Sequence, residues 1–295
     1  MKKLIVTSML GFIYPALACT TFATFNGEND SIVMAKNRDN RPDRQIIQVV
    51  AEKDKFKYLA LSRQDYPNFV SAGINEKNLA VFNEVTVEYS DKAVGAIDDD
   101  FSKDILQNYA TAKAVIPDIA KLVAKYPDPV FYQIVDNKQI LSIEVAPDHK
   151  FTYKLTDKGT FTHTNNYQDG SLIKDYPYTA SEKVRLQDSQ MRLFRAKTMV
   201  GSKSGMTLDD MQIVALDHNK GPNNSIYRTG EVNDPRSVRS LAFFAVEIPK
   251  TKGEAAQVSA NLYNVGERYR FTLDDGFWSQ YKGQYTILSP NIKNK

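Results

Sequence analysis

The sequence has 295 residues, of which 42% are hydrophobic and 25% are charged, a composition typical of folded proteins that excludes collagen-like, coiled-coil and wholly disordered chains. Its 38 basic and 35 acidic side chains leave a formal net charge of +3, so nothing in the composition indicates nucleic acid or an anionic membrane as a partner. Cys19 is the only cysteine, which excludes an intramolecular disulfide.

The first 18 residues have the pattern of a secretory signal peptide. Lys2 and Lys3 precede an apolar stretch over residues 4–17, and Ala16 and Ala18 provide the small residues of a signal peptidase site. The stretch is shorter than the roughly 20 apolar residues of a membrane-spanning helix, so we expect no stable membrane insertion. We therefore predict an exported protein, periplasmic or secreted, whose leader is residues 1–18.

Cleavage after Ala18 would make Cys19 the N-terminal residue of the mature chain. The α-amine, with an unperturbed pKa of about 7.7 to 8.0, would then lie on the same residue as the thiol and accept its proton. Two other interpretations of Cys19 stay open at this point. Cys19 is also placed for lipidation, although no polar tether follows it, and a single cysteine is often simply a buried thiol.

The chain after the leader begins with predicted strands. Residues 20–25 and 31–35 flank Asn26-Gly27, a dipeptide typical of a tight hairpin turn, so we expect these two runs to pair. Apolar and alternating runs predict further strands over residues 45–51, 56–61, 79–87, 130–135, 139–145, 151–155 and 161–164.

Helices are predicted in the middle of the chain, and strands return at its end. Apolar residues at helical spacing predict helices over residues 101–114, 116–126, 181–200 and 207–217. Closing strands are expected over residues 241–248, 257–263 and 269–273. This order favours an α+β layered fold over alternating βαβ units. No internal repeat or long linker divides residues 19–295, so we predict one domain.

Three polar clusters lie on or beside predicted strands. Residues 36–39 end the second strand of the predicted hairpin, whose pairing returns them towards Cys19. Asn83 interrupts an apolar strand, and residues 162–167 place amides just beyond another strand. A buried amide either makes a structural hydrogen bond or points a donor into a site, and a developing oxyanion would need such a donor.

These clusters occur in the order seen in N-terminal nucleophile amide hydrolases. The segments concerned are Cys19-Thr20-Thr21-Phe22, Lys36-Asn37-Arg38-Asp39, residues 73–79, Asn83, Thr164-Asn165-Asn166, Asp217-His218 and Ser225-Ile226-Tyr227-Arg228. From residue 19 to about residue 228 the chain resembles the choloylglycine hydrolase and penicillin V acylase group and the related acyl-coenzyme A:6-aminopenicillanic acid acyltransferase family. The resemblance implies a four-layer αββα sandwich, in which two antiparallel sheets stack between layers of helices.

The resemblance also implies roles for catalytic residues. It makes Cys19 the nucleophile, its α-amine the base, and Asp39 the carboxylate that positions the amine. Asn83 and Asn165 are similar to the asparagines that form the oxyanion hole or hold the amine. An arginine is expected near the nucleophile, and we predict Arg185, at the opening of the helix after the asparagine pair.

Lys36 and Asn166 are the residues expected to bind substrate, Asn166 being also the register alternative to Asn165. The family usually has arginine where Lys36 stands, and a lysine cannot reproduce bidentate guanidinium contacts, so substrate or amine positioning is expected to differ. The residues around Tyr227 also depart from the commoner pattern, which leaves the role of Arg228 open.

The activity implied is hydrolysis of a linear amide bond in an N-acylated small molecule through a thioester on Cys19, with no cofactor and no metal. Acyl transfer through the same thioester stays open, as does a homo-oligomer. Signal peptidase is the expected maturation partner, with autocatalytic removal of the leader as a variant. The alternative from another class is a lipid-anchored, non-catalytic envelope protein acylated at Cys19. The three histidines, at positions 149, 163 and 218, show neither a cysteine-protease signature nor metal-ligand spacing.

Overall fold

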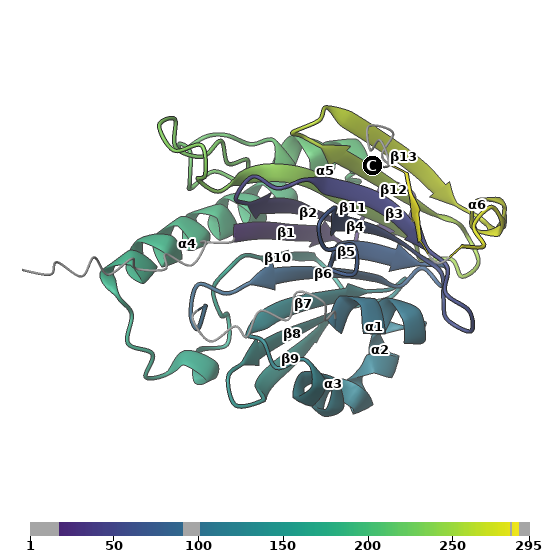
Figure 1. The fold of residues 1–295 in the computed structure, drawn as a ribbon, viewed down its shortest axis with the longest axis horizontal. Coiled ribbons are helices and arrows are strands. Elements are labelled where there is room, and N and C mark those ends of the chain that lie inside the picture. Colours follow the sequence, from purple (N-terminus) through teal and green to yellow (C-terminus); the bar gives the residue numbers. More distant parts are fainter. Residues whose placement is uncertain (1–17, 91–100, 284, 289–295) are drawn as a thin grey trace, which may run out of the picture.

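The computed structural model describes residues 18–90, 101–283 and 285–288, which form two antiparallel sheets with helices outside them (Figure 1). Of the predicted leader only Ala18 falls within these ranges, as the first residue of β1. The rest of the predicted leader lies outside the described residues.

The six-stranded sheet combines the N-terminal hairpin with the closing strands. Its order is β10-β1-β2-β11-β12-β13, so β1 and β2 are interior strands. The strands are Ala18–Thr24 (β1), Ser31–Asn40 (β2), Thr160–His163 (β10), Arg239–Pro249 (β11), Ala256–Leu262 (β12) and Glu267–Leu273 (β13).

The eight-stranded sheet is a meander to which the last strand is added. Its order is β14-β3-β4-β5-β6-β7-β8-β9. The strands are Gln45–Val50 (β3), Tyr58–Arg63 (β4), Val70–Asn75 (β5), Ala80–Val85 (β6), Val130–Val135 (β7), Ile140–Ala146 (β8), Lys150–Thr156 (β9) and Tyr285–Ile287 (β14).

Six α-helices lie among the described residues, and two short 3₁₀ turns accompany them. The helices are Phe101–Asn108 (α1), Ala112–Val115 (α2), Ile119–Lys125 (α3), Ala180–Gly201 (α4), Leu208–Ala215 (α5) and Asp275–Ser279 (α6), and the turns are Ile116–Asp118 and Gly170–Ile173. None of the helices in the described ranges is both long and apolar enough to cross a bilayer.

Three apolar cores hold four layers together. The core between the sheets includes Met34, Phe82 and Phe244, a second core packs α1–α3 on the eight-stranded sheet, and a third packs α4 and α5 on the six-stranded sheet. The predicted α+β sandwich of two antiparallel sheets between helix layers is confirmed, because alternate residues of the central strands face opposite cores.

One predicted helix is divided in two, and β5 is not among the predicted strands. The helix expected over residues 101–114 ends at Asn108, whose Nδ2 donates to the Asp104 carbonyl, and α2 begins anew after Thr111, whose hydroxyl accepts from Ala114 N. Gly73 lies within β5. A Cβ on Gly73 would lie 2.9 Å from the Leu59 carbonyl oxygen, so the close strand approach requires glycine.

Candidate active site

Cys19 is the second residue of β1, and its side chain is 1% exposed. The register of β1 and β2 places Arg38 directly opposite Cys19. The Sγ atom lies 4.0 Å from Arg38 Nη1 and 4.0 Å from the backbone carbonyl oxygen of Asp39. The prediction that the hairpin returns residues 36–39 to Cys19 is therefore confirmed.

The backbone nitrogen of Cys19 donates a hydrogen bond of 3.1 Å to Asn165 Oδ1. Four further hydrogen bonds hold Asn165 in place, one of them from Val87 N to its backbone carbonyl at 2.6 Å. Its Oδ1 accepts from Arg192 Nη2 at 2.8 Å, its Nδ2 donates to the Val85 carbonyl at 2.8 Å, and its backbone nitrogen donates to Ser189 Oγ at 3.0 Å. One Nδ2 proton of Asn165 has no partner among the described residues. The structure thus brings the predicted nucleophile and one predicted asparagine into direct contact.

Asp39 is fully buried at the end of β2 and is only half satisfied. Its Oδ1 accepts a hydrogen bond of 2.7 Å from Ser240 Oγ, whereas its Oδ2 has no partner in the described part of the chain. Burial raises the pKa of Asp39 to about 6, although Arg228, Arg192 and Ser240 oppose this shift. The Oδ2 atom of Asp39 can therefore accept a further hydrogen bond.

Two buried arginines add positive charge to the site. Arg192 is 2% exposed and Arg228 is 6% exposed, and both donate to Asn223, at 3.1 Å to its carbonyl and 3.0 Å to its Oδ1. Burial lowers the pKa of Arg192 to about 10, and Asp39 opposes this. Arg192 therefore remains cationic at neutral pH. With Arg38 at 4.0 Å from Sγ, these cations make the surroundings of Cys19 electropositive.

Arg192, and not Arg185, is the arginine of α4 that reaches the site. The Arg185 side chain is one quarter exposed, and its nearest carboxylate is Glu182, at 3.9 Å. Arg192 lies two turns later on the buried stripe of α4, between Ser189 and Ala196. The sequence does contain a signal for Arg192. The small residues Ser189 and Ala196, seven positions apart, mark the face of α4 that packs on the sheet, and Arg192 lies on that face.

Lys36 is fully buried and contacts the protein itself. Its Nζ donates to the Ser71 carbonyl at 2.8 Å, to Ser71 Oγ at 2.9 Å, to Asn83 Oδ1 at 3.1 Å and to the Asn83 carbonyl. The β5–β6 pairing runs from Ala72 to Ile74, so Lys36 joins these two strands beyond their last paired residues. Burial lowers the pKa of Lys36, whereas Cys19 raises it. The hydrogen bonds of Lys36 are thus made to the protein, and its predicted role in binding substrate stays a prediction.

The side chain of Asn83 is also committed to the protein. Its two Nδ2 protons are used by the Val70 carbonyl at 2.7 Å and by Ser102 Oγ at 3.2 Å. An oxyanion role for Asn83 stays a prediction.

The side chain of Asn166 is held through its oxygen, because Oδ1 accepts from Ser189 Oγ at 2.8 Å and from Thr164 Oγ1 at 3.2 Å. Its substrate contact stays a prediction too.

Replacing Lys36 by methionine is expected to destabilise the protein by about 2 to 4 kcal/mol, because the acceptors of Ser71 and Asn83 would be left buried without a donor. Urea unfolding followed by circular dichroism measures the change. Lys154→Met, at an exposed position of β9, is the matched control and should shift stability by less than about 0.5 kcal/mol. Equal midpoints for both variants would show that the Lys36 contacts contribute nothing.

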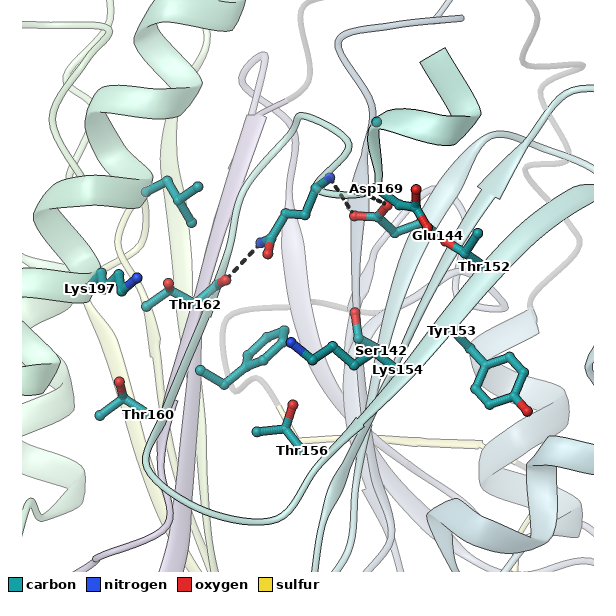
Figure 2. A pocket seen from close by; sticks show the side chains of 14 residues that line it. Ser142, Glu144, Thr152, Tyr153, Lys154, Thr156, Thr160, Thr162, Asp169 and Lys197 are labelled. Atoms are coloured by element: carbon teal, nitrogen blue, oxygen red, sulfur yellow. Dashed lines mark hydrogen bonds between the residues drawn. The ribbon is translucent and has the colours of Figure 1, made fainter. Parts of the chain in front are cut away.

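A cavity of about 580 Å³ opens where β8 and β9 of one sheet face β10 of the other, beside α4 (Figure 2). Among the described residues, those that line this cavity include Ser142, Glu144, Thr152 and Lys154. Neither Cys19 nor Asn165 lines it.

No cluster of three or more histidine, cysteine or acidic side chains suited to a metal ion is found among residues 18–90, 101–283 and 285–288. His163 lies buried against Glu144, and His218 Nδ1 lies 3.0 Å from the Tyr227 carbonyl. Within the described part of the chain, neither histidine forms a hydrogen bond with Cys19.

Similarity to known proteins is found at the level of structure alone. No protein-family model matches the sequence, and no curated protein does. Among solved structures, the chain is similar to a cysteine-to-alanine mutant of a conjugated bile acid hydrolase from Clostridium perfringens. The TM-score is 0.59 at 13% sequence identity, and the match covers 92% of this chain and 97% of that one. At this identity the similarity shows the fold alone, so the chain shares the α+β sandwich fold of that solved structure.

Proposed function

We propose that the protein is an amide hydrolase whose nucleophile is Cys19, made N-terminal when the Ala18–Cys19 bond is cleaved during export. The observation that carries this proposal is the 3.1 Å hydrogen bond from the Cys19 nitrogen to Asn165 Oδ1, inside the buried cluster of Asp39 and Arg192. Cleavage would convert this amide nitrogen into an α-amine at a position that already has its hydrogen-bond acceptor.

Cys19 would then supply both the base and the nucleophile. The amine takes the thiol proton, and sulfur attacks the carbonyl carbon of an N-acylated small molecule. The tetrahedral intermediate collapses as the C–N bond breaks, and the proton held by the amine passes to the leaving nitrogen. A thioester remains on Sγ. Water then attacks this thioester, which releases the carboxylic acid and returns a proton to Sγ.

The surrounding charges suit this sequence of steps. The unpartnered Oδ2 of Asp39 would accept from the new amine and stabilise its protonated form. The remaining Nδ2 proton of Asn165 and the guanidinium of Arg38 would stabilise the oxyanion. The buried cations and amides around Sγ support this role, because a cysteine that only anchors a lipid needs no such groups beside its sulfur.

Removal of the leader must make Sγ accessible, because Cys19 is buried in the 295-residue chain. We therefore expect an aromatic disulfide reagent to modify the single thiol after processing and not before it. Absorbance of the released thiolate measures the reaction on both forms of the native protein, with urea-unfolded protein as the control for full reactivity. An inert thiol in the processed native protein would contradict the proposed nucleophile.

The activity itself is tested with a panel of N-acyl amides on processed and leader-retaining protein. Conjugated bile salts come first, because the similar solved structure is a conjugated bile acid hydrolase, followed by penicillin V and acyl homoserine lactones. We expect release of the amine from at least one of them by the processed form alone. Added amines that capture the acyl group would show transfer instead of hydrolysis. A diacylglyceryl mass on Cys19 would rule the enzyme out, because a thioether cannot attack.

A further inference from the structure

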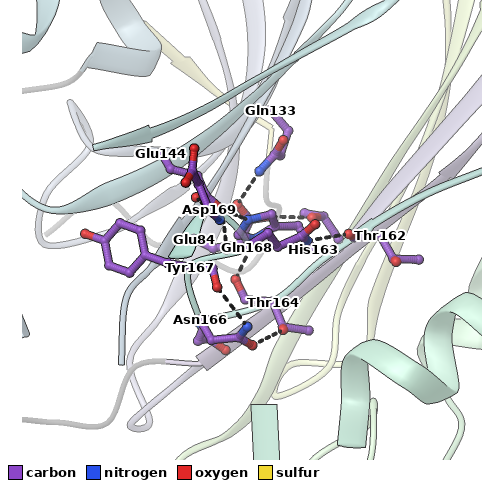
Figure 3. A network of polar contacts seen from close by, with 12 residues as sticks. Glu84, Gln133, Glu144, Thr162, His163, Thr164, Asn166, Tyr167, Gln168 and Asp169 are labelled. Atoms are coloured by element: carbon purple, nitrogen blue, oxygen red, sulfur yellow. Dashed lines mark hydrogen bonds and ion pairs between the residues drawn. The ribbon is translucent and has the colours of Figure 1, made fainter. Parts of the chain in front are cut away.

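Glu144 lies on β8 of the eight-stranded sheet and reaches across to the segment that follows β10 of the other sheet (Figure 3). Its Oε1 accepts from His163 Nε2 at 2.9 Å and from Gln168 N at 2.8 Å, and its Oε2 accepts from Asp169 N at 3.0 Å. One carboxylate that is 6% exposed thus holds both ends of residues 164–167. Asn165, the acceptor for the Cys19 nitrogen, lies within this segment.

The contacts of His163 define its protonation state. Its Nδ1 lies 2.8 Å from the Thr164 carbonyl oxygen, which can only accept, so Nδ1 carries a proton. Its Nε2 lies 2.9 Å from a carboxylate oxygen of Glu144, so Nε2 also donates. The ring is 1% exposed and packs against Phe131, with 4.6 Å between ring centroids. His163 is therefore assigned as an imidazolium from its partners.

The charges around His163 agree with this assignment. Glu84, 1% exposed, accepts from Thr21 Oγ1 and, at 3.4 Å, from Gln133 Nε2. Burial raises the pKa of Glu84, and the charges of His163 and Lys36 oppose this. Burial alone would lower the pKa of His163, but the hydrogen bond to Glu144 and the charges of Glu84 and Glu144 raise it. An imidazolium at His163 and the ammonium of Lys36 balance the two carboxylates.

We propose that His163 and Glu144 are positioning residues that hold the segment carrying Asn165 in register with the nitrogen of Cys19. The His163 ring fixes the Thr164 carbonyl, the group directly before Asn165, while Glu144 fixes the far end of the segment. Loss of either anchor would displace the Asn165 amide and with it the amine of the processed chain. This role rests on the proposed function, although the state of His163 can be measured without any substrate.

The first test is ¹⁵N NMR of histidine-labelled protein, with the three histidines assigned by substitution. We expect two protonated ring nitrogens on His163 at pH 7, and loss of this state in Glu144→Gln, whose amide cannot accept from three donors. We also expect the Asn165 side-chain resonances to move in Glu144→Gln. They should stay in place in His149→Asn, a histidine control at an exposed position with φ of 58° that asparagine tolerates.

The second test is kinetic and applies to the processed protein. Glu144→Gln and His163→Asn are expected to lower kcat by about tenfold to a hundredfold with KM changed less than about threefold, because a misplaced catalytic group slows the chemical step. His149→Asn should retain wild-type values. A neutral His163 in the wild type, unmoved Asn165 resonances or an unchanged kcat would overturn the proposal. If no amide is cleaved by any form, the proposed function fails, and the NMR result alone decides the role of His163 and Glu144.

Discussion

Cys19→Ala is expected to lower amide cleavage by the processed protein by at least about 10⁴-fold, as loss of a covalent nucleophile does in comparable enzymes. Alanine keeps the α-amine and the hydrogen bond to Asn165, so the variant removes the sulfur alone. The fold should persist, because the nearest hydrogen-bonding groups to Sγ lie 4.0 Å away. Progress curves with the best substrate of the panel measure the loss, and the unfolding midpoint checks the fold.

Cys19→Ser refines this expectation. Serine retains an N-terminal amine beside a much weaker nucleophile, so its activity should fall between those of alanine and cysteine. Activity of Cys19→Ala within tenfold of the wild type would mean that another group performs the attack.

Arg192→Met is expected to lower kcat by about 10²-fold, with a smaller change in KM. The substitution removes the 2.8 Å donor that holds Asn165 Oδ1 and a cation close to Asp39 and Cys19. Arg192→Lys keeps the charge but not the forked geometry, and we expect it to recover only part of the loss. Steady-state kinetics on each processed variant measure these effects.

Arg185→Met is the matched control, since it removes the same type of side chain from the same helix. Arg185 contacts Glu182 near the start of α4, so its loss should leave kcat within about twofold of the wild type. Equal losses in the two variants would show that α4 acts through its overall stability rather than through Arg192.

The layered fold was predictable because its signals are local. The Asn26-Gly27 turn between two apolar runs predicts the β1–β2 hairpin, and the register of that hairpin alone sets Arg38 and Asp39 beside Cys19. Three of the four predicted helices are found with altered bounds, because their caps and apolar spacing are local signals, whereas the helix predicted over residues 101–114 is divided into α1 and α2. β5 was missed because its polar end at Asn75 resembles a turn, while its pairing with β4 and β6 is a long-range property.

The site was only partly predictable, because its contacts join distant segments. Cys19, Asp39 and Asn165 belong to motifs that can be recognised along the chain, and the structure gathers them. Arg192 and Ser240 complete the same site, yet they lie 173 and 221 positions from Cys19 and follow no motif. Lys36 was expected to bind substrate and Asn83 to stabilise an oxyanion, but the two side chains contact each other. A residue type shows what chemistry is available, and only the packing shows where its donors are used.

N-terminal sequencing of the purified, active protein tests the central claim most directly. The first three cycles are expected to read Cys19, Thr20 and Thr21, with the amine and thiol both free by intact mass. An active protein that begins at any other residue, or that carries a covalent group on either atom, would contradict it.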